Sequence, residues 1–294
     1  MKMNDYLQGF LSYLSIEKAA RPSTLKDYRK EIEKLFSYFD ENSIKLLDVS
    51  ISEIRQYLCY VKEKRSLSQN SLSKIIAIIK SFFNYLEDEE AVVKNPARKI
   101  KMARKKPRIP RIISKFEFEL LLSSIEFAPA RNQKNIIRDK LIFSLLYYSG
   151  IRRNELLSLS WSDINLSKST LAIRSGKGGK DRIIPLHSSL GPFLEEYLKQ
   201  RLPLKDNALF VGEAGKRLCR ASFVNLLNLY LTLSGLSGKG YSAHSFRHSF
   251  ATNLIQSGAD LFKVQRLLGH ASLDSTKIYI NFNSSQMAKA VERL

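Results

Sequence analysis

Apolar residues recur every three or four positions over the first ninety residues, which is the spacing of one buried helical face. Two long helices follow from this pattern, one beginning at Ser23 and one capped by Ser68 or Ser71. Shorter helices are expected over residues 4–14 and 51–64. The pattern therefore predicts a four-helix domain at the N-terminus.

A basic, proline-containing segment interrupts this pattern between Ala91 and Arg111. It holds nine lysines and arginines, no acidic residue and three prolines. Proline removes a backbone donor and disfavours helix in the preceding residue, so the segment is predicted to be an extended connector. The expected division is a helical domain at 1–100, a linker at 101–113 and a second domain at 114–294. The linker is either a solvated spacer or a strap that lies along DNA phosphates.

The second domain mixes helices with a short hairpin. Ser114 and Glu117 have the spacing of a capping box, and a dense apolar run over 135–149 predicts the central buried helix. Short alternating runs on both sides of residues 176–180 predict two antiparallel strands joined by a glycine-rich turn. The expected fold is mainly α with a small antiparallel β-sheet, in two domains.

The chain returns to helices after the hairpin. They are expected over 223–234, 245–257 and 260–268, and a last short helix would carry Tyr279. Residues 284–294 have apolar positions on one side. This tail either folds back on its own domain or is donated to a neighbouring protomer.

The charge balance indicates that the chain binds a polyanion. Lysine and arginine number 48 against 28 acidic residues, which gives a formal charge of +20 and a pI near 9.9. Nucleic acid is the expected partner. An acidic membrane surface is the competing partner, but no apolar run is long enough to span a bilayer and no basic amphipathic terminus is present.

Cysteine usage indicates the cytoplasm. Cys59 and Cys219 are far apart and neither has a partner at metal-ligand spacing. They are expected to be reduced, partly buried thiols. Acidic residues interrupt the first twenty positions, so no secretory signal is expected there.

Six side chains of the second domain could together handle a phosphate. A guanidinium clamps phosphate oxygens, an imidazole moves a proton near neutral pH, and a phenol can become a covalent nucleophile. His244 and His248 are four residues apart, as metal ligands often are, but no third ligand accompanies them and no metal is expected. In chain order the six candidates are Arg152, Lys177, His244, Arg247, His270 and Tyr279.

These candidates lie in the motifs Gly-Ile-Arg-Arg-Asn-Glu-Leu, His-x-x-Arg, Leu-Leu-Gly-His and Thr-Lys-Ile-Tyr. In order and approximate spacing they resemble the active site of the tyrosine recombinases, the phage-type integrase family. The resemblance covers residues 112–281, and the chain is similar in size to Xer recombinases and transposon-borne resolvases. Ile151 stands where leucine is usual and Ala243 where proline is common, and neither is a catalytic group.

The resemblance implies a site-specific recombinase that cleaves and rejoins DNA through a 3′-phosphotyrosyl link, without ATP, metal or another cofactor. Tyr279 would be the nucleophile, and Arg152 and Arg247 would hold the scissile phosphate. His244 would assist removal of the phenol proton. Lys177 would protonate the leaving 5′ oxygen.

The remaining expectations also come from the resemblance. His270 would hydrogen-bond the phosphate, and Glu155 would support the arginines. The two domains would form a clamp around DNA, with four protomers of one or two recombinases on two sites. Dimer resolution, cointegrate resolution and integration stay open as biological roles. Apart from the resemblance, the charge of the linker and of the hairpin leads us to expect basic side chains that face the DNA backbone or solvent. They are Lys101, Arg104, Lys105, Lys106, Lys180 and Arg182.

Two other classes of protein stay open at this point. A non-catalytic DNA-binding protein accounts for the charge and the helices, but not for a phenol, two imidazoles and two guanidiniums in matching order. A type IB topoisomerase uses the same chemistry on DNA without a specific site or a second duplex.

Overall fold

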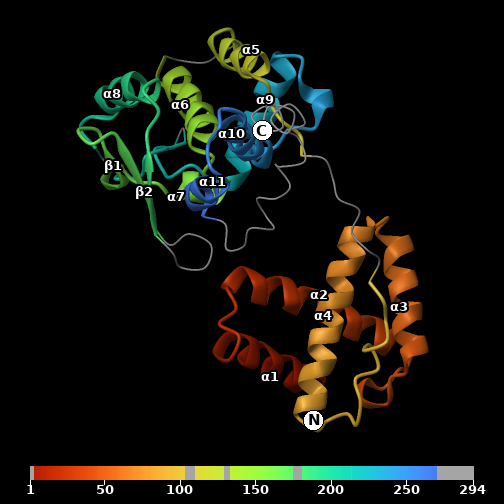
Figure 1. Ribbon diagram of the computed structural model, residues 1–294. Helices are drawn as coiled ribbons and strands as arrows, with labels where there is room; N and C mark the ends of the chain where they lie inside the picture. Colours follow the sequence, from red (N-terminus) through yellow and green to blue (C-terminus); the bar gives the residue numbers. More distant parts are fainter. Residues whose placement is uncertain are drawn as a thin grey trace, which may run out of the picture. The chain divides into compact units, whose positions relative to one another are not determined.

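Figure 1 shows the computed structural model of the chain, which describes residues 3–102, 110–128, 133–174, 181–204, 206–212 and 214–269. The chain divides into two compact units, Met1–Arg108 and Ile109–Leu294. None of the helices in the described ranges combines the length and the apolar character needed to cross a membrane.

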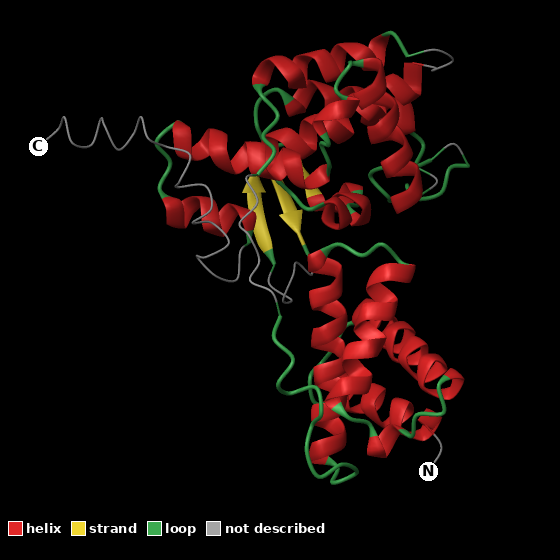
Figure 2. Cartoon of the chain, turned by 90° about the vertical axis from the view of Figure 1, so that its right-hand side faces the viewer, coloured by secondary structure: helices red, strands yellow, loops and turns green. Residues whose placement is uncertain are grey.

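The first unit contains four α-helices over its described residues, as the apolar spacing predicts. Figure 2 draws this part of the chain entirely as helix and loop. Ser50 caps the third helix in a capping box with Glu53, and the Ser68 side chain caps the fourth. The helices are α1 (Met3–Ile16), α2 (Pro22–Glu41), α3 (Ile51–Lys64) and α4 (Gln69–Asp88), with a 3₁₀ turn at Leu46–Asp48.

Helix α4 forms the centre of the first unit and packs against the other three helices. Phe82 and Phe83 on α4 are fully buried. The ring of Phe82 meets Phe10 of α1 edge-on at 5.2 Å and Phe36 of α2 at 5.6 Å between centroids. These aromatic contacts hold α1 and α2 on one side of α4.

Residues 91–100 are not the extended connector that the sequence predicts. The Asn95 side chain accepts a hydrogen bond from the Ala97 backbone N–H at 2.7 Å and donates to the Lys80 carbonyl of α4 at 3.2 Å. The prediction is wrong here because apolar residues occur among the basic ones and pack into the core of the first unit. The buried apolar side chains are Val92, Ala97 and Ile100.

The two cysteines also differ from expectation. Cys59 and Cys219 are free thiols, and both are exposed rather than partly buried. Cys59 lies on α3 outside the buried face of that helix, and Cys219 is the N-cap residue of a later helix, where its sulfur accepts a hydrogen bond from the Ser222 backbone N–H.

The second unit contains the sheet and the other helices. Its 3₁₀ turns lie at Trp161–Asp163 and Ser237–Lys239. The remaining elements are α5 (Lys115–Glu126), α6 (Gln133–Ser149), α7 (Arg153–Ser158), β1 (Ile164–Asn165), β2 (Thr170–Ile173), β3 (Arg182–Pro185), α8 (Leu190–Arg201), α9 (Arg220–Leu233), α10 (Ala243–Gln256) and α11 (Leu261–Leu268).

The three strands form one antiparallel sheet in the order β1-β2-β3 (Figure 2). Leu171 of β2 pairs with Ile184 of β3, and both side chains are buried. The predicted hairpin and the mainly helical fold with a small antiparallel sheet are thus confirmed. Strand β1 and helix α8 have no counterpart among the predicted elements.

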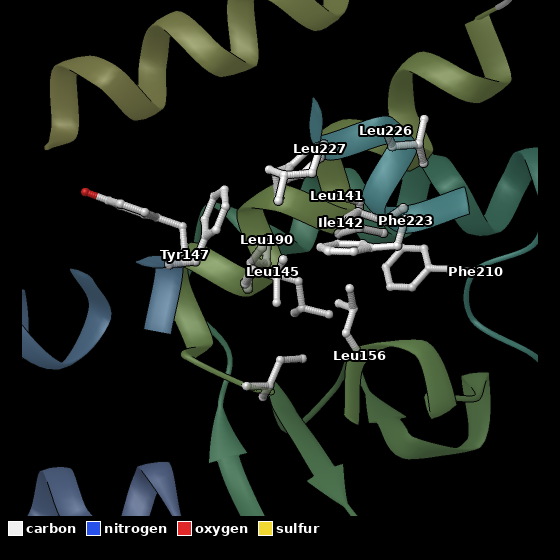
Figure 3. Packing of buried hydrophobic residues seen from close by; sticks show 14 of the residues in the cluster. Leu141, Ile142, Leu145, Tyr147, Leu156, Leu190, Phe210, Phe223, Leu226 and Leu227 are labelled. Carbon is white, nitrogen blue, oxygen red and sulfur yellow. The ribbon is translucent and has the colours of Figure 1, made fainter. Parts of the chain in front are cut away.

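Helix α6 is the central buried helix of the second unit, as its apolar run predicts. It lies between α8 and α10 (Figure 1). Figure 3 shows Leu141, Ile142 and Leu145 of α6 packed among side chains from the surrounding elements. The ring of Phe143 stacks near that of Phe246 on α10 at 5.8 Å. The core of this unit therefore fixes α10 against α6.

The residues just before α5 are tied to α10 and the loop that precedes it. The Ile113 backbone N–H donates to Ser249 Oγ of α10 at 2.7 Å. Arg111 Nη1 donates to the Gly240 carbonyl at 2.6 Å, and the Tyr241 hydroxyl donates to Glu117 Oε1 at 2.8 Å. Residues 111–117, where the chain enters the second unit, therefore help to fix the position of α10.

Replacing Ser114 by alanine tests the predicted capping box. Ser114 Oγ accepts from the Glu117 N–H at 3.2 Å, and Glu117 Oε2 accepts from the Ser114 N–H at 2.9 Å. We expect the variant to lose about 1 kcal/mol of unfolding free energy. Urea unfolding followed by the fluorescence of Trp161, the one tryptophan in the sequence, measures this loss. The control is Ser123→Ala on the exposed side of α5, which should change little.

Candidate active site

The candidate site is built around the start of α7. Arg152 is the N-cap residue of this helix, two positions after Gly150, whose φ is +61°. The Arg152 backbone N–H donates to Glu155 Oε2 at 2.8 Å, and its Nη1 donates to Oε1 at 2.7 Å. The two side chains are 21% and 8% exposed, so this is a largely buried pair and not a surface ion pair.

A second arginine from the sheet also holds Glu155. Arg182, the first residue of β3, donates from Nη1 to Oε1 at 3.0 Å and from Nη2 to Oε2 at 2.7 Å. Burial alone would raise the pKa of Glu155, but the hydrogen bonds from Arg182 and Arg152 outweigh burial and hold the pKa at about 2. Glu155 is therefore a carboxylate at neutral pH.

Three arginines from three different elements converge on the C-terminal end of α11. The last carbonyls of a helix have no intrahelical partner, and they carry the negative end of the helix dipole. This three-arginine cluster (Arg152, Arg182 and Arg247) supplies one donor to each of three successive carbonyls. The bonds are Arg182 Nε to Leu267 O at 2.9 Å, Arg247 Nη2 to Leu268 O at 2.6 Å, and Arg152 Nη2 to Gly269 O at 2.9 Å.

Arg247 lies on α10 and is 5% exposed. Its Nη1 also donates to the Gly150 carbonyl at 2.8 Å. A Cβ at position 150 would lie 2.3 Å from Phe250 Cδ1, and the left-handed backbone there disfavours side chains as well. Glycine at this position therefore lets the end of α6 approach α10 closely enough for Arg247 to join α6 to α11.

His244 lies three residues before Arg247 on the same helix and keeps an exposed edge. Partial burial lowers its pKa, and the positive charges of Arg247, Arg153 and Arg152 lower it further. The imidazole is therefore mainly neutral at pH 7 and can accept a proton.

His248 lies one turn after His244 on α10, and no group of three potential metal ligands occurs within the described ranges. Burial lowers the pKa of His248 to about 4, and the nearby His244 and Arg247 act in the same direction. In the unfolded chain a histidine titrates near 6.5. The folded state thus resists protonation of this ring.

We expect stability to fall between pH 6.5 and 4, because the unfolded state binds the proton first. Between pH 7 and 5 the share of the loss that comes from His248 should be up to about 2 kcal/mol, and His248→Gln should remove this share. Urea unfolding of both proteins at the two pH values measures the difference. The matched control is His187→Gln, which makes the same substitution at an exposed histidine and leaves His248 in place.

Several predicted site residues lie outside the described residues. Lys101 is described and exposed. The predictions that fall outside are Lys177, His270 and Tyr279, the basic residues Arg104, Lys105, Lys106 and Lys180, and the tail at 284–294.

Arg182 has contacts that its expected place at the DNA backbone does not explain. Its side chain is 10% exposed and is bonded to Glu155 and α11. Side chains two apart on a strand share a face, and Ile184 is 1% exposed. The alternation along β3 was therefore the available signal that Arg182 points inward.

Comparison with known proteins identifies the family. The phage integrase family profile matches residues 112–286, and the N-terminal SAM-like domain profile of phage integrases matches residues 7–90. The tyrosine recombinase XerC of Roseiflexus sp. (strain RS-1) is 33% identical, covering 98% of this chain and 93% of the relative. The tyrosine recombinase XerD of Vibrio vulnificus (strain YJ016) is 30% identical, with coverages of 96% and 92%.

Solved structures give the same result. A crystal structure of the XerH site-specific recombinase bound to palindromic difH substrate, in a post-cleavage complex, is 25% identical with a TM-score of 0.78, covering 97% of this chain and 83% of that one. The pre-cleavage complex of XerH with difH is 26% identical with a TM-score of 0.71, with coverages of 90% and 79%. These matches confirm the resemblance seen in the motifs. The chain therefore belongs to the phage integrase family of tyrosine recombinases.

Proposed function

We propose that the chain is a site-specific recombinase that breaks and rejoins double-stranded DNA through a covalent link to Tyr279. Family membership supports this reaction, and the related XerH is bound to its difH substrate in the crystal. The charge of +20 favours a polyanionic partner. The observation that carries the proposal is the meeting of Arg152 and Arg247 at successive carbonyls of α11, with His244 on the same helix as Arg247.

Arg152 and Arg247 would hold the non-bridging oxygens of the scissile phosphate. A guanidinium has five N–H donors. The side-chain bonds of Arg152 to Glu155 and Gly269 use Nη1 and Nη2 once each, so the group can bind a phosphate oxygen without releasing either support. Two fixed positive charges would offset the charge of the pentacoordinate transition state.

The chemical step is an in-line displacement at phosphorus. Tyr279 Oη forms the new bond to phosphorus, and the bond from phosphorus to the 5′ oxygen breaks. The phenol proton passes to neutral His244, and Lys177 gives a proton to the leaving oxygen. The products are a 3′-phosphotyrosyl link and a 5′-hydroxyl. Attack by a 5′-hydroxyl from a second strand reverses these steps, so neither ATP nor a metal enters them.

His270 would add a hydrogen bond to the same phosphate. It follows Gly269 in the sequence, and a peptide bond sets neighbouring Cα atoms about 3.8 Å apart. The Gly269 carbonyl accepts from Arg152. The residue before His270 in the chain is therefore bonded to one of the two proposed phosphate-binding arginines.

The assembly follows the same proposal. Four protomers, of this recombinase alone or with a related one, act on two DNA sites in the cytoplasm. Residues 1–100 and 114–294 close on DNA as a clamp joined by the linker at 101–113, and the tail at 284–294 either folds back on its own unit or is donated to a neighbouring protomer. The products serve dimer resolution, cointegrate resolution or integration. The side chains proposed to meet the DNA backbone are Lys101, Arg104, Lys105, Lys106 and Lys180.

Mapping the covalent adduct tests the proposed function. The wild-type chain first selects its binding site from a random duplex library. Duplexes that carry this site, nicked at successive positions, are then incubated with the protein. We expect an adduct that survives denaturation and, after proteolysis, a nucleotide on the peptide that contains Tyr279.

Three outcomes would contradict this proposal. An adduct on a different residue, or no adduct with any nicked duplex, removes Tyr279 as nucleophile. A protein that relaxes supercoiled plasmids of any sequence and never joins strands from two sites acts as a type IB topoisomerase instead.

A further inference from the structure

We propose that Arg182 is a positioning residue for DNA cleavage, which acts through Glu155 and the end of α11 and not through the DNA backbone. The inference rests on the proposed function, because Arg152, Arg247 and His270 are the groups that Arg182 would position. Three features of its surroundings support it.

The first feature is the charge environment. Both Nη atoms of Arg182 donate to the two oxygens of Glu155, at 3.0 and 2.7 Å. Parallel bonds of this kind are strong and fix the planes of both groups. The two side chains are 10% and 8% exposed. With its bond from Nε to Leu267, all three nitrogens of the Arg182 guanidinium already donate within the protein.

The second feature is that the arginines of the three-arginine cluster have different contacts. Arg152 and Arg247 support Gly269 and Leu268, and both are proposed to bind phosphate as well. Arg182 supports Leu267 through Nε, which its bonds to Glu155 do not use. It can therefore hold the last turn of α11 whether or not DNA is bound. That turn ends at Gly269, the residue before His270 in the sequence.

The third feature is the close packing of Arg182 against the end of α11. Gly269 has a φ of +63°, and a Cβ there would lie 3.2 Å from Arg182 Nη1 and 3.3 Å from its Cδ. The Arg182 side chain thus packs closely against Gly269, the residue before His270 in the sequence. Glu155 and Gly269 both also bond to Arg152. A displacement of Arg182 would therefore move this proposed phosphate ligand through either contact.

The test compares Arg182→Gln and Arg182→Lys with the wild type on the selected nicked duplex. The matched control is Arg174→Gln in the same hairpin, where Arg174 is 67% exposed and pairs with Asp163. Three quantities are measured: the single-turnover rate of adduct formation at saturating duplex, the dissociation constant of the duplex, and its dependence on salt.

We expect Arg182→Gln to lower the rate at saturation about 100-fold, the effect of a misplacement of about 1 Å at a reacting centre. The dissociation constant should change less than about threefold, and its salt dependence should stay the same. Arg182→Lys should also be slow, since an ammonium cannot form the parallel bonds to Glu155 and the bond to Leu267 together. Arg174→Gln should behave as wild type.

The opposite pattern would overturn the inference. Weaker binding, a salt slope reduced by about 1 and an unchanged rate at saturation would make Arg182 a DNA backbone ligand. The double variant with Glu155→Gln gives a second check. If Arg182 acts through Glu155, the double variant should lose much less rate than the product of the two single-variant rate losses. A rate loss equal to that product would contradict the inference.

A measurement without DNA separates this inference from the proposed function. Amide hydrogen exchange over residues 265–269 should be faster in Arg182→Gln than in the wild type and unchanged in Arg174→Gln. Unchanged exchange in Arg182→Gln contradicts the positioning role. A wild-type protein that forms no adduct contradicts the proposed function instead, and the exchange result still decides the role of Arg182 at α11.

Discussion

Replacing Tyr279 by phenylalanine should abolish the covalent adduct and leave DNA binding intact. The variant keeps the ring but has no oxygen to bond to phosphorus, and loss of a covalent nucleophile lowers rates by at least about 10⁴-fold. The groups proposed to bind phosphate, Arg152 and Arg247, are unchanged. Gel-shift assays on the selected duplex measure binding, and denaturing gels of the nicked duplex measure the adduct.

Tyr148→Phe is the control for the loss of a tyrosine hydroxyl in the same unit. Tyr148 stacks on His187 at 4.3 Å between ring centroids, so its ring has a packing role that phenylalanine preserves. This variant should form the adduct at the wild-type rate. An adduct that persists in Tyr279→Phe would show that the nucleophile is another group.

Replacing Arg247 by lysine should slow adduct formation by about 10²–10³-fold at saturating DNA. The guanidinium bonds the Gly150 and Leu268 carbonyls from separate nitrogens and is also proposed to hold the phosphate. A lysine places one compact charge at the end of a flexible stem, so it cannot serve three acceptors in three directions. Single-turnover kinetics on the nicked duplex measure the effect.

The variant should also be less stable, since a buried carbonyl that loses its donor costs about 1–3 kcal/mol. Arg201→Lys separates the two effects. Arg201 donates to the carbonyls of Asp206, Ala208 and Leu209 at 2.9 to 3.1 Å, beyond the end of α8 and outside the three-arginine cluster. It should lose stability but keep the rate. Equal rate losses in both variants would mean that destabilisation, and not phosphate binding, explains the result at Arg247.

Sequence signals predict a helix well where the residues that cap or end it lie next to it in the chain. Ser114 with Glu117 marks the start of α5, and Gly150 follows the end of α6. Such caps involve residues a few positions apart, so they are visible without the fold. Helix α8 was missed because Gly191 and Pro192 resemble a break, although proline is tolerated in the first turn of a helix.

The sequence predicts candidate groups for the site, but not how the described ones are held. Glu155 was expected beside Arg152 because the two are three residues apart. Its bond to Arg182 joins residues 27 positions apart and depends on the register of β3 against the core. The burial of residues 91–100 was missed for a similar reason, because the apolar side chains there matter only once α4 is in place.

The acceptors of the three-arginine cluster on α11 are main-chain oxygens of Leu267, Leu268 and Gly269. Every residue type carries such an oxygen, so substitutions at the first two positions can change packing without deleting a hydrogen-bond acceptor. Deletion or insertion of a single residue in α11 would instead shift all three acceptors at once. These hydrogen bonds therefore depend on the length of this helix more than on its composition.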